Sequence, residues 1–453
     1  MEQRIESPHR SKFSGKIGFV LAAAGSAVGL GNIWRFPYLA AKYGGGVFLL
    51  VYLILVLTFG FSVMVGEIAI GRKTGKSPIG AFAALNKKYK FVGFIASLIA
   101  FLILPYYSVI GGWVAKYFAV FLTGGGSNAA TDEFFGGFIS KPLEPIMWQS
   151  LFVIAAFIVV VRGVKKGIES ASKVLMPILI ALCIILSIYS ITLPGAWEGV
   201  KYYILPDFSH FSSKTVLAAL GQMFYSLSLA MGIMITYGSY LRREDNLEQS
   251  VKQIAIFDAG IAFLAGLMIV PAVFAFNRDA LGAGPGLMFI TLPKVFANTG
   301  AANIIGTIFF LLVIFAALTS AISLMEAVVS TVCDQFKLKR TSASIIVASL
   351  AILLGIPSSL GYGPWDSVRI LGMEILDFFD FITNSVLMPI TALLTCIFIG
   401  YVVGTDVIAK EVKQSGEFKW EKLFTVVIKY FAPIFIIVIL FTSVLSAFGV
   451  INI

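Results

Sequence analysis

The chain contains apolar stretches that are too long and too numerous for a water-soluble protein. Runs of about 17 to 25 residues, the length that crosses a bilayer as a helix, recur along all 453 residues. With 58% apolar and 13% charged residues, this pattern predicts an all-α polytopic membrane protein. About eleven spans are predicted, near residues 16–40, 46–70, 91–123, 146–162, 170–193, 215–240, 252–277, 303–335, 342–360, 371–402 and 423–449.

The distribution of Lys and Arg predicts how these spans are oriented. The net charge of +10 comes largely from short loops after the second, fourth, sixth, eighth and tenth spans. By the positive-inside rule these loops are cytoplasmic, so the charge indicates topology rather than binding to nucleic acid. We therefore expect a protein of the plasma (inner) membrane, with a cytoplasmic N-terminal segment at 1–15, no removable signal peptide and an external C-terminus.

The first predicted span is interrupted by residues that do not suit a plain membrane anchor. The sequence GSAVGLGNIWRFP at 25–37 contains three glycines, an Asn and an Arg. A mid-helix Gly costs about 1 kcal/mol relative to Ala, and a charged side chain within the bilayer is costly. If the helix unwinds around 28–31, its freed carbonyls can coordinate a cation and its freed N–H groups can hold a carboxylate.

A second interrupted span lies at 221–232, where Ser, Gln and Gly residues cluster. It is the sixth span, so the two breaks divide ten spans into sets of five, at 16–193 and 215–402. An odd-numbered repeat is inserted upside down relative to its copy, which favours an inverted-repeat transporter with its binding site at the membrane midplane. We expect 16–402 to form the transporter core and 403–453 a cytoplasmic loop with the eleventh helix.

The run GSAVGLGNIWRFPY at 25–38 resembles the first-helix signature of the neurotransmitter:sodium symporters. Further motifs of this family occur in the same order, at 44–48, at 67–72, at Tyr107 with Trp113, in the sixth span, and at 316–320. The resemblance implies a LeuT-like fold with a 5+5 inverted repeat, broken helices 1 and 6, and an eleventh helix, as in many bacterial members. It also implies sodium-coupled symport of a small molecule by alternating access.

The resemblance implies two sodium sites and no organic cofactor. Hard monovalent cations take oxygen ligands from carbonyl, hydroxyl, amide and carboxylate groups, and the matching residues carry such groups. For the first sodium the matching positions are Ala27, Asn32, Ser226 and Asp258, together with the carboxylate of the substrate. For the second sodium they are Gly25, Val28, Ala316, Thr319 and Ser320.

Asp258 is an intramembrane carboxylate and is therefore a functional candidate by itself. Many relatives have Asn at the matching position, and eukaryotic members use a chloride ion close by. Some chloride-independent members carry Glu one turn further on, where this chain has Ala262. Gln222 and Tyr52 match other chloride-site positions. Because Asp258 can supply the fixed negative charge that balances sodium, we expect chloride-independent transport.

The resemblance implies that the substrate is a small-molecule L-amino acid. Its carboxylate would meet the N–H groups of Leu30 and Gly31, the Tyr107 hydroxyl and the first sodium. With Ser26 in place of an acidic residue, a zwitterion is expected rather than a bare amine, and a mostly apolar wall predicts a neutral hydrophobic or aromatic side chain. The predicted substrate site comprises Ser26, Ala27, Leu30, Gly31, Ile103, Tyr107, Tyr225, Ser226, Ser228, Met231, Ser320 and Leu324.

Charges on either side of this site match two gates. On the outer side Arg35 is expected to pair with Asp377, and Asp380, one turn further on, is the alternative partner. On the cytoplasmic side Arg10 and Asp334 match the second gate.

The fifth span contains Gly167, nine further residues and then Pro177, a spacing that resembles one in these carriers. Proline removes a helix hydrogen bond and glycine lowers the cost of unwinding. The cytoplasmic half of this helix can therefore open and let water reach the second sodium.

Three other functions were weighed against this one. A proton-coupled amino acid transporter of the same fold would favour a Lys in place of the hydroxyl pair Thr319 and Ser320, so sodium is preferred. A channel needs a polar stripe along several helices, whereas polarity here clusters at one depth. An enzyme needs a nucleophile with a base, or a metal set, but His9 and His210 lie outside the spans and the three cysteines lack such spacing. No oligomeric state is predicted.

Overall fold

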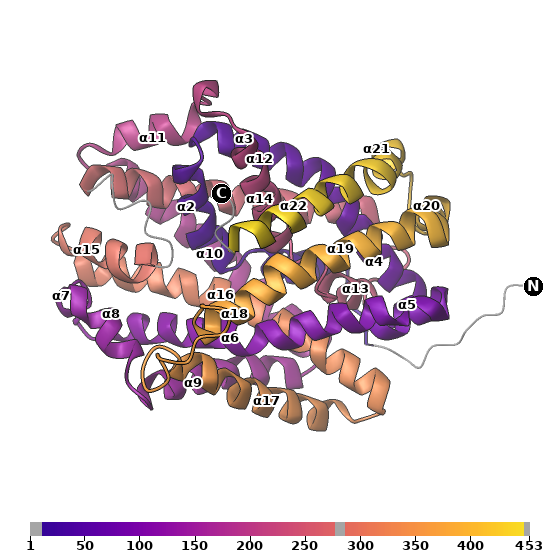
Figure 1. The fold of residues 1–453 in the computed structure, drawn as a ribbon, viewed down its shortest axis with the longest axis horizontal. Coiled ribbons are helices and arrows are strands. Elements are labelled where there is room, and N and C mark those ends of the chain that lie inside the picture. The colour runs from indigo at the N-terminus through magenta and orange to yellow at the C-terminus, as the bar shows by residue number, and fades with distance from the viewer. Residues whose placement is uncertain (1–10, 277–285, 448–453) are drawn as a thin grey trace, which may run out of the picture.

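The computed structural model describes residues 11–276 and 286–447, which form a bundle of helices running side by side along its long axis (Figure 1). Within these residues, nine helices are long and apolar enough to cross a bilayer, and a bent pair at the start makes ten. The sixth predicted span is a pair of shorter helices. Within the described residues, helices thus occupy most of each stretch that the apolar runs predicted, because each run satisfies its own backbone hydrogen bonds.

Some of the unbroken spanning helices carry short π-helical turns at which two labelled pieces join. Four of these turns are η2 (Val56–Gly60), η8 (Phe381–Leu387), η9 (Phe398–Gly404) and η10 (Val427–Phe431). In chain order the helices are α3 (Gly46–Leu55) with α4 (Phe61–Thr74), α6 (Lys90–Leu122), α9 (Glu144–Val161), α10 (Ser170–Ile191), α14 (Leu247–Phe276), α16 (Ala302–Phe336), α17 (Arg340–Leu360), α18 (Ile375–Asp380) with α19 (Met388–Ile397) and α20 (Thr405–Lys413), and α21 (Glu421–Val426) with α22 (Ala432–Ala447).

The first helix is broken as its glycines predicted. It consists of α1 (Lys16–Ala27), the π-helical turn η1 (Gly31–Arg35) and α2 (Phe36–Lys42), and the two halves are bent by 54°. Val28 has an extended backbone with ψ of 98°. Residues 28–30 therefore leave the helical hydrogen-bond pattern in the middle of the bundle.

The sixth helix is broken as well. It consists of α12 (Ser213–Ser226) and α13 (Ile233–Gly238), separated by an irregular segment at 227–232. Ser228 and Ala230 have φ angles of 52° and 64°, which are uncommon for residues other than glycine. This backbone persists only because neighbouring groups hold it in place.

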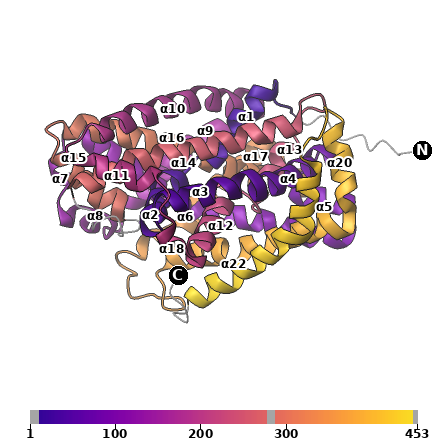
Figure 2. The same cartoon turned by 90° about the horizontal axis from the view of Figure 1, so that it is seen from above.

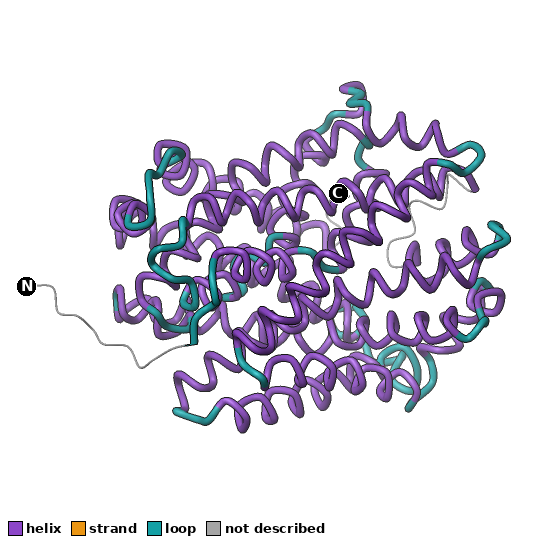
Figure 3. The backbone as a smooth tube through the Cα atoms, turned by 180° about the vertical axis from the view of Figure 1, so that it is seen from behind, coloured by secondary structure: helices purple, strands orange, loops and turns teal. Residues whose placement is uncertain are grey.

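Most loops and short helices gather at the two ends of the bundle, as Figure 3 shows. At one end are α7 (Gly126–Ala129), α8 (Asp132–Ile139), α11 (Ala196–Ile204) and α15 (Leu292–Ala297), and at the opposite end are α5 (Pro78–Leu85), α13 and α20 (Figure 1). The segment between α14 and α16 lies partly outside the described residues. Its described part is η7 (Leu287–Thr291) followed by α15.

The tenth helix extends well beyond its predicted end at residue 402. It continues through η9 and α20 to Lys413, so the boundary expected between 402 and 403 lies inside a continuous helix. The charged residues after Gly404 suggested a loop. Instead Glu411 is buried and pairs with Arg72 of α4, with 2.9 Å between Oε1 and Nε. This contact stabilises a polar helix that the local sequence did not predict.

We expect Arg72→Met to lower the free energy of unfolding by about 3–5 kcal/mol, because it leaves the buried Glu411 carboxylate without its partner. The double variant Arg72→Met/Glu411→Leu should recover most of this loss, since it removes both charges. The differences in stability are measured by thermal unfolding in detergent. The readout is a thiol-specific dye that reacts with the buried Cys183 and Cys396 as they become exposed. A double variant no more stable than the single one would contradict this account.

Candidate functional site

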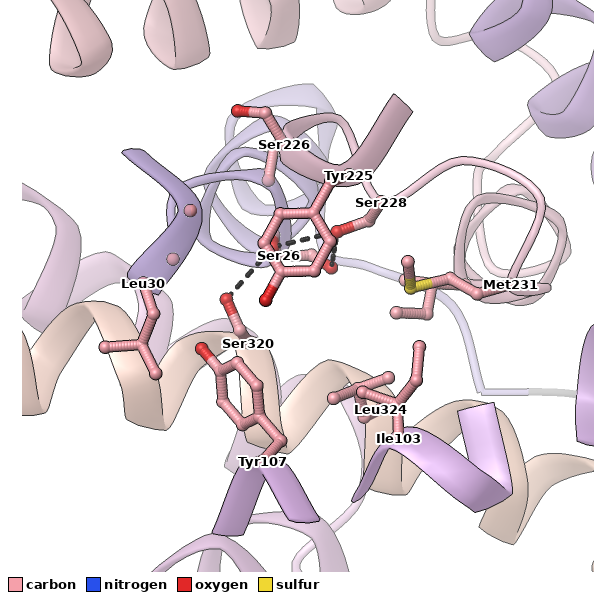
Figure 4. Close-up of a pocket in the computed structure, with 14 residues that line it drawn as sticks. Ser26, Leu30, Ile103, Tyr107, Tyr225, Ser226, Ser228, Met231, Ser320 and Leu324 are labelled. Carbon is pink, nitrogen blue, oxygen red and sulfur yellow. Dashed lines mark hydrogen bonds between the residues drawn. The ribbon is translucent and has the colours of Figure 1, made fainter. Parts of the chain in front are cut away.

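A cavity enclosing about 390 Å³ of empty space lies between the two helix breaks (Figure 4). Its walls come from the broken first and sixth helices and from α6 and α16. All of the residues predicted for the substrate site line it, and so do Gly29 and Ile233, which were not predicted. Gly29 lies within the interrupted run at 25–37, which was the available signal, whereas Ile233 begins the second half of the sixth helix, one residue beyond the stretch at 221–232.

A small network of serines joins three helices at one side of this cavity, as Figure 4 shows. The Ser26 carbonyl accepts hydrogen bonds from the Ser228 hydroxyl (2.9 Å) and from the Ser320 hydroxyl (3.1 Å). The Ser26 hydroxyl donates to the Ser228 hydroxyl at 3.1 Å. The Ser26 carbonyl, which lies near the break of the first helix, therefore receives its hydrogen bonds from hydroxyl groups of the sixth and eighth helices.

Beside this network the cavity carries the hydroxyl of Tyr107. It is buried, makes no hydrogen bond of good geometry among the described residues, and lies near the Ser320 side chain and the Leu30 backbone. It lies close to Gly29, since a Cβ there would be 3.3 Å from the Tyr107 oxygen, and a Cβ on Gly31 would be 2.7 Å from the Tyr225 ring. The two glycines therefore let the tyrosines approach the unwound backbone, where a carboxylate would find N–H and O–H donors.

Two of the residues expected at the first sodium, Asn32 and Ser226, donate to the carboxylate of a third, Asp258. Asp258 Oδ1 accepts hydrogen bonds from Asn32 Nδ2 (2.8 Å) and from the Ser226 hydroxyl (2.6 Å), and Oδ2 accepts from the Tyr52 hydroxyl (2.7 Å). Asn32 Oδ1 in turn accepts the Gly29 N–H at 3.1 Å. Asp258 itself is fully buried. The cluster offers a carboxyl group and several other oxygens beside the cavity, and oxygen ligands of this kind suit a small cation.

The residues expected at the second sodium lie where the first and eighth helices touch. A Cβ on Gly25 would be 3.3 Å from Cβ of Thr319. The Thr319 hydroxyl donates to the carbonyls of Phe315 (3.0 Å) and Ala316 (3.1 Å), as mid-helix threonines often do. Its oxygen keeps a lone pair for a cation, and Val28 lies at the break of the same first helix.

At the outer gate the structure favours Asp380 rather than the expected Asp377. Arg35 lies over the Tyr225 ring, with Cζ 5.2 Å from the ring centroid, and lines a second cavity of about 520 Å³ together with Asp380. Asp377 instead interacts with Arg369. The two aspartates are one turn apart on the same helix, so only the depth of that helix in the bundle decides which one faces Arg35.

The gate expected on the cytoplasmic side is described only in part, because Arg10 lies outside the described residues. The other expected member, Asp334, accepts the backbone N–H of Ser77 at 2.9 Å. Phe13 is buried and makes edge contacts with the rings of Tyr237 and Tyr240. An apolar plug is therefore present beside the start of α1.

Glu67 supports the site but was not among the predicted site residues. Its Oε1 accepts the backbone N–H of Ala230 at 2.8 Å, and Ala230 belongs to the irregular segment of the sixth helix. Glu67 is fully buried on α4. It thus supplies the acceptor that this unwound backbone lacks, a contact between residues far apart in the chain.

Comparison with known proteins agrees with this geometry. The family model of the sodium:neurotransmitter symporters matches residues 10–127 and 141–450. The chain belongs to this family. An uncharacterized sodium-dependent transporter of Bacillus subtilis is 37% identical over 435 residues, which are 94% of this chain and 96% of the relative. A sodium- and chloride-dependent GABA transporter of Drosophila melanogaster is 30% identical over 90% of this chain and 48% of its own length.

The crystal structure of MhsT in complex with L-phenylalanine superposes on this structure with a TM-score of 0.87 and 41% identity. The match covers 96% of this chain and 99% of MhsT. The sodium:neurotransmitter symporter described here therefore has the LeuT-like fold and is a sodium-dependent transporter of a small molecule rather than an enzyme.

We expect Glu67→Ala to destabilise the transporter by about 1–3 kcal/mol beyond any change in packing, because the buried Ala230 N–H loses its acceptor. Glu67→Gln keeps an oxygen acceptor and should cost less. Melting temperatures of the purified variants, compared in the same detergent, measure this order. Equal losses for Gln and Ala would mean that the hydrogen bond does not support the break.

Proposed function

We propose that this transporter imports a neutral, hydrophobic or aromatic L-amino acid together with two sodium ions, by alternating access and without chloride. The observation that carries this proposal is the central cavity, which is bounded by both helix breaks and lined by all of the residues predicted for the substrate. One end presents Tyr107 and the unwound backbone, and the other presents aliphatic side chains.

The charge of the cavity lining supports a zwitterionic ligand. None of the residues that line it carries a formal charge. A ligand with one positive and one negative group therefore needs no counter-charge from the wall, whereas a bare amine would lack one. The sodium of the first site would add a positive charge at the carboxylate end of the ligand.

The wall opposite the polar groups supports an apolar ligand side chain. Ile103, Met231, Ile233 and Leu324 line this part of the cavity, and Met can repack around ligands of different shape. MhsT, solved with L-phenylalanine, has the same fold. Aromatic and branched aliphatic amino acids are therefore the first substrates to test.

The environment of Asp258 supports chloride independence. Its carboxylate accepts hydrogen bonds from Asn32, Ser226 and Tyr52, and these contacts hold it beside the central cavity. A fixed carboxylate can balance the sodium charge, which elsewhere in the family requires a chloride ion.

Two sodium ions provide enough energy for uphill import. Moving one charge through 100 mV yields about 2.3 kcal/mol, so two sodium ions with a neutral amino acid yield roughly 4.6 kcal/mol. This corresponds to about three decades of concentration before the sodium gradient is added. For inward transport we propose that the N-terminus and the end with α5, α13 and α20 are cytoplasmic and that the C-terminus is external.

The central test is uptake of labelled amino acids into proteoliposomes with and without an inward sodium gradient. We expect uptake of L-phenylalanine, or of another neutral apolar amino acid, that requires sodium and does not respond to a proton gradient. Sodium-independent uptake, or none for any neutral amino acid in the panel, would overturn the proposal. Proton-driven uptake would favour the proton-coupled alternative.

Removal of the Tyr107 hydroxyl tests the proposed carboxylate contact. Tyr107→Phe should weaken amino acid binding about 10- to 100-fold, because the buried ligand carboxylate loses a donor. Equilibrium binding of the labelled substrate to detergent-solubilised protein measures this change. Tyr106→Phe is the matched control, since the Tyr106 hydroxyl contacts Thr383 instead of the cavity. Equal effects of the two variants would remove Tyr107 from the site.

Replacement of chloride tests the role of Asp258. Substituting gluconate for chloride should change the uptake rate of the native protein less than about twofold, because the compensating charge is covalently attached. Asp258→Asn should transport more slowly and should regain part of its rate when chloride is added. A large loss of native uptake in gluconate would show that chloride is required.

A further inference from the structure

The buried Glu169 contacts the segment that precedes the first helix at Ser14, which is itself exposed. Glu169 is the last residue of η4 (Val164–Glu169), the π-helical turn that opens the fifth span, and it is 1% exposed. Its Oε2 accepts the backbone N–H of Ser14 at 2.8 Å, and its Oε1 accepts the Ser14 hydroxyl. Lys173, one turn along α10, pairs with Oε1 at 2.6 Å. The carboxylate thus joins two helices that are distant in the chain.

The first helix is shaped to receive this carboxylate. A Cβ on Gly18 would lie 2.3 Å from Glu169 Oε1 and 2.4 Å from its carboxyl carbon, so a larger residue at this position would have to displace the carboxylate. Figure 2 shows α1 beside α10, and the two helices contact each other directly. Phe13, next to Ser14, is itself buried. Residues 13–18 are therefore held in place at both ends, by Phe13 in the apolar plug and by the contact with the fifth helix.

The contact separates an open cavity from the residues proposed for the second sodium. The cavity encloses about 1,020 Å³ and is lined by Ser14 to Gly18, Lys173, Arg242, Asp245 and Gln253. On the other side of the contact, Met176 lies seven residues after Glu169, two helical turns along the same face. A Cβ on Gly25 would be 3.3 Å from the sulfur of Met176.

We propose that Glu169 is a positioning residue that holds the first helix against the fifth and keeps the second sodium site closed toward this end of the protein. Its contact with Ser14 must break before sodium can leave. A buried carboxylate with several donors is stable, whereas one that loses them must gain water. The contact between Glu169 and Ser14 therefore has two states: it is either formed, or it is broken and the carboxylate is hydrated. This role rests on the alternating-access cycle proposed above and adds a residue to it.

Accessibility of a cysteine behind the contact tests the proposal. We place Met176→Cys in a background without Cys183, Cys333 and Cys396, and measure its labelling by a membrane-impermeant methanethiosulfonate in detergent, with sodium present and no amino acid. Glu169→Ala should accelerate labelling about tenfold or more, because the charge-assisted hydrogen bonds are lost. Glu169→Gln should have a smaller effect, since its amide oxygen can still accept the Ser14 N–H.

Gly18→Ala perturbs the same contact from the first helix and removes no hydrogen-bonding group. Its methyl group should displace the flexible carboxylate, so labelling accelerates as for Glu169→Ala. In the Glu169→Ala background the same change should add nothing, because its target is absent. Equal acceleration by Gly18→Ala in both backgrounds would mean general disturbance of the helix and would overturn the proposal.

A matched control is Glu198→Ala, which breaks the exposed pair with Lys201 on α11 at the opposite end of the protein. It should leave the labelling rate unchanged. Unchanged rates in both Glu169→Ala and Gly18→Ala would refute the proposal, and Gly18→Ala alone decides it if Glu169→Ala does not fold. The labelling assay needs no substrate, so a failure of the uptake test would count against the proposed function and leave this result to stand separately.

Discussion

A helix that breaks inside a membrane leaves backbone groups that lipid cannot satisfy, and the structure is arranged around two such breaks. Each break is satisfied by groups from other helices. The Gly31 carbonyl accepts from the side chain of Gln222 at 2.9 Å, and the Ala230 N–H donates to Glu67. Because these partners come from within the protein, the unwound segments can face one another and enclose a cavity instead of contacting lipid.

The same breaks bring the proposed ion and substrate groups into one network. Ser226 lines the central cavity and also donates to the Asp258 carboxylate, while Asn32 joins that carboxylate to the N–H of Gly29. A cation bound by these oxygens would therefore change the electrostatic environment of the ligand carboxylate directly. Coupling between sodium and substrate then requires only differential binding at adjacent groups, without a long pathway.

Much of the candidate site could be predicted because its residues lie in local patterns. The glycines of 25–31 interrupt an apolar run, so the break was visible before any tertiary contact was known. The break at 227–232 followed from Ser and Gly residues in a similar setting. By contrast, the charged residues after Gly404 read as a loop, because nothing near them in the chain indicates that Glu411 meets Arg72 in the buried interior. A charged residue in the sequence predicts an exposed position correctly only when no residue distant in the chain compensates its charge in the interior.

The sequence alone determined the approximate positions of most membrane-spanning helices, the two breaks and the residue types around them, because bilayer thickness and helix geometry act on each segment separately. The tertiary structure decided that Asp380 rather than Asp377 lies near Arg35, that Glu67 holds the sixth-helix break, and that Glu169 receives Ser14. These contacts depend on the depth and rotation at which whole helices pack. No local sequence pattern distinguishes two aspartates that lie one turn apart. Only the packing of their helix decides which of them faces Arg35.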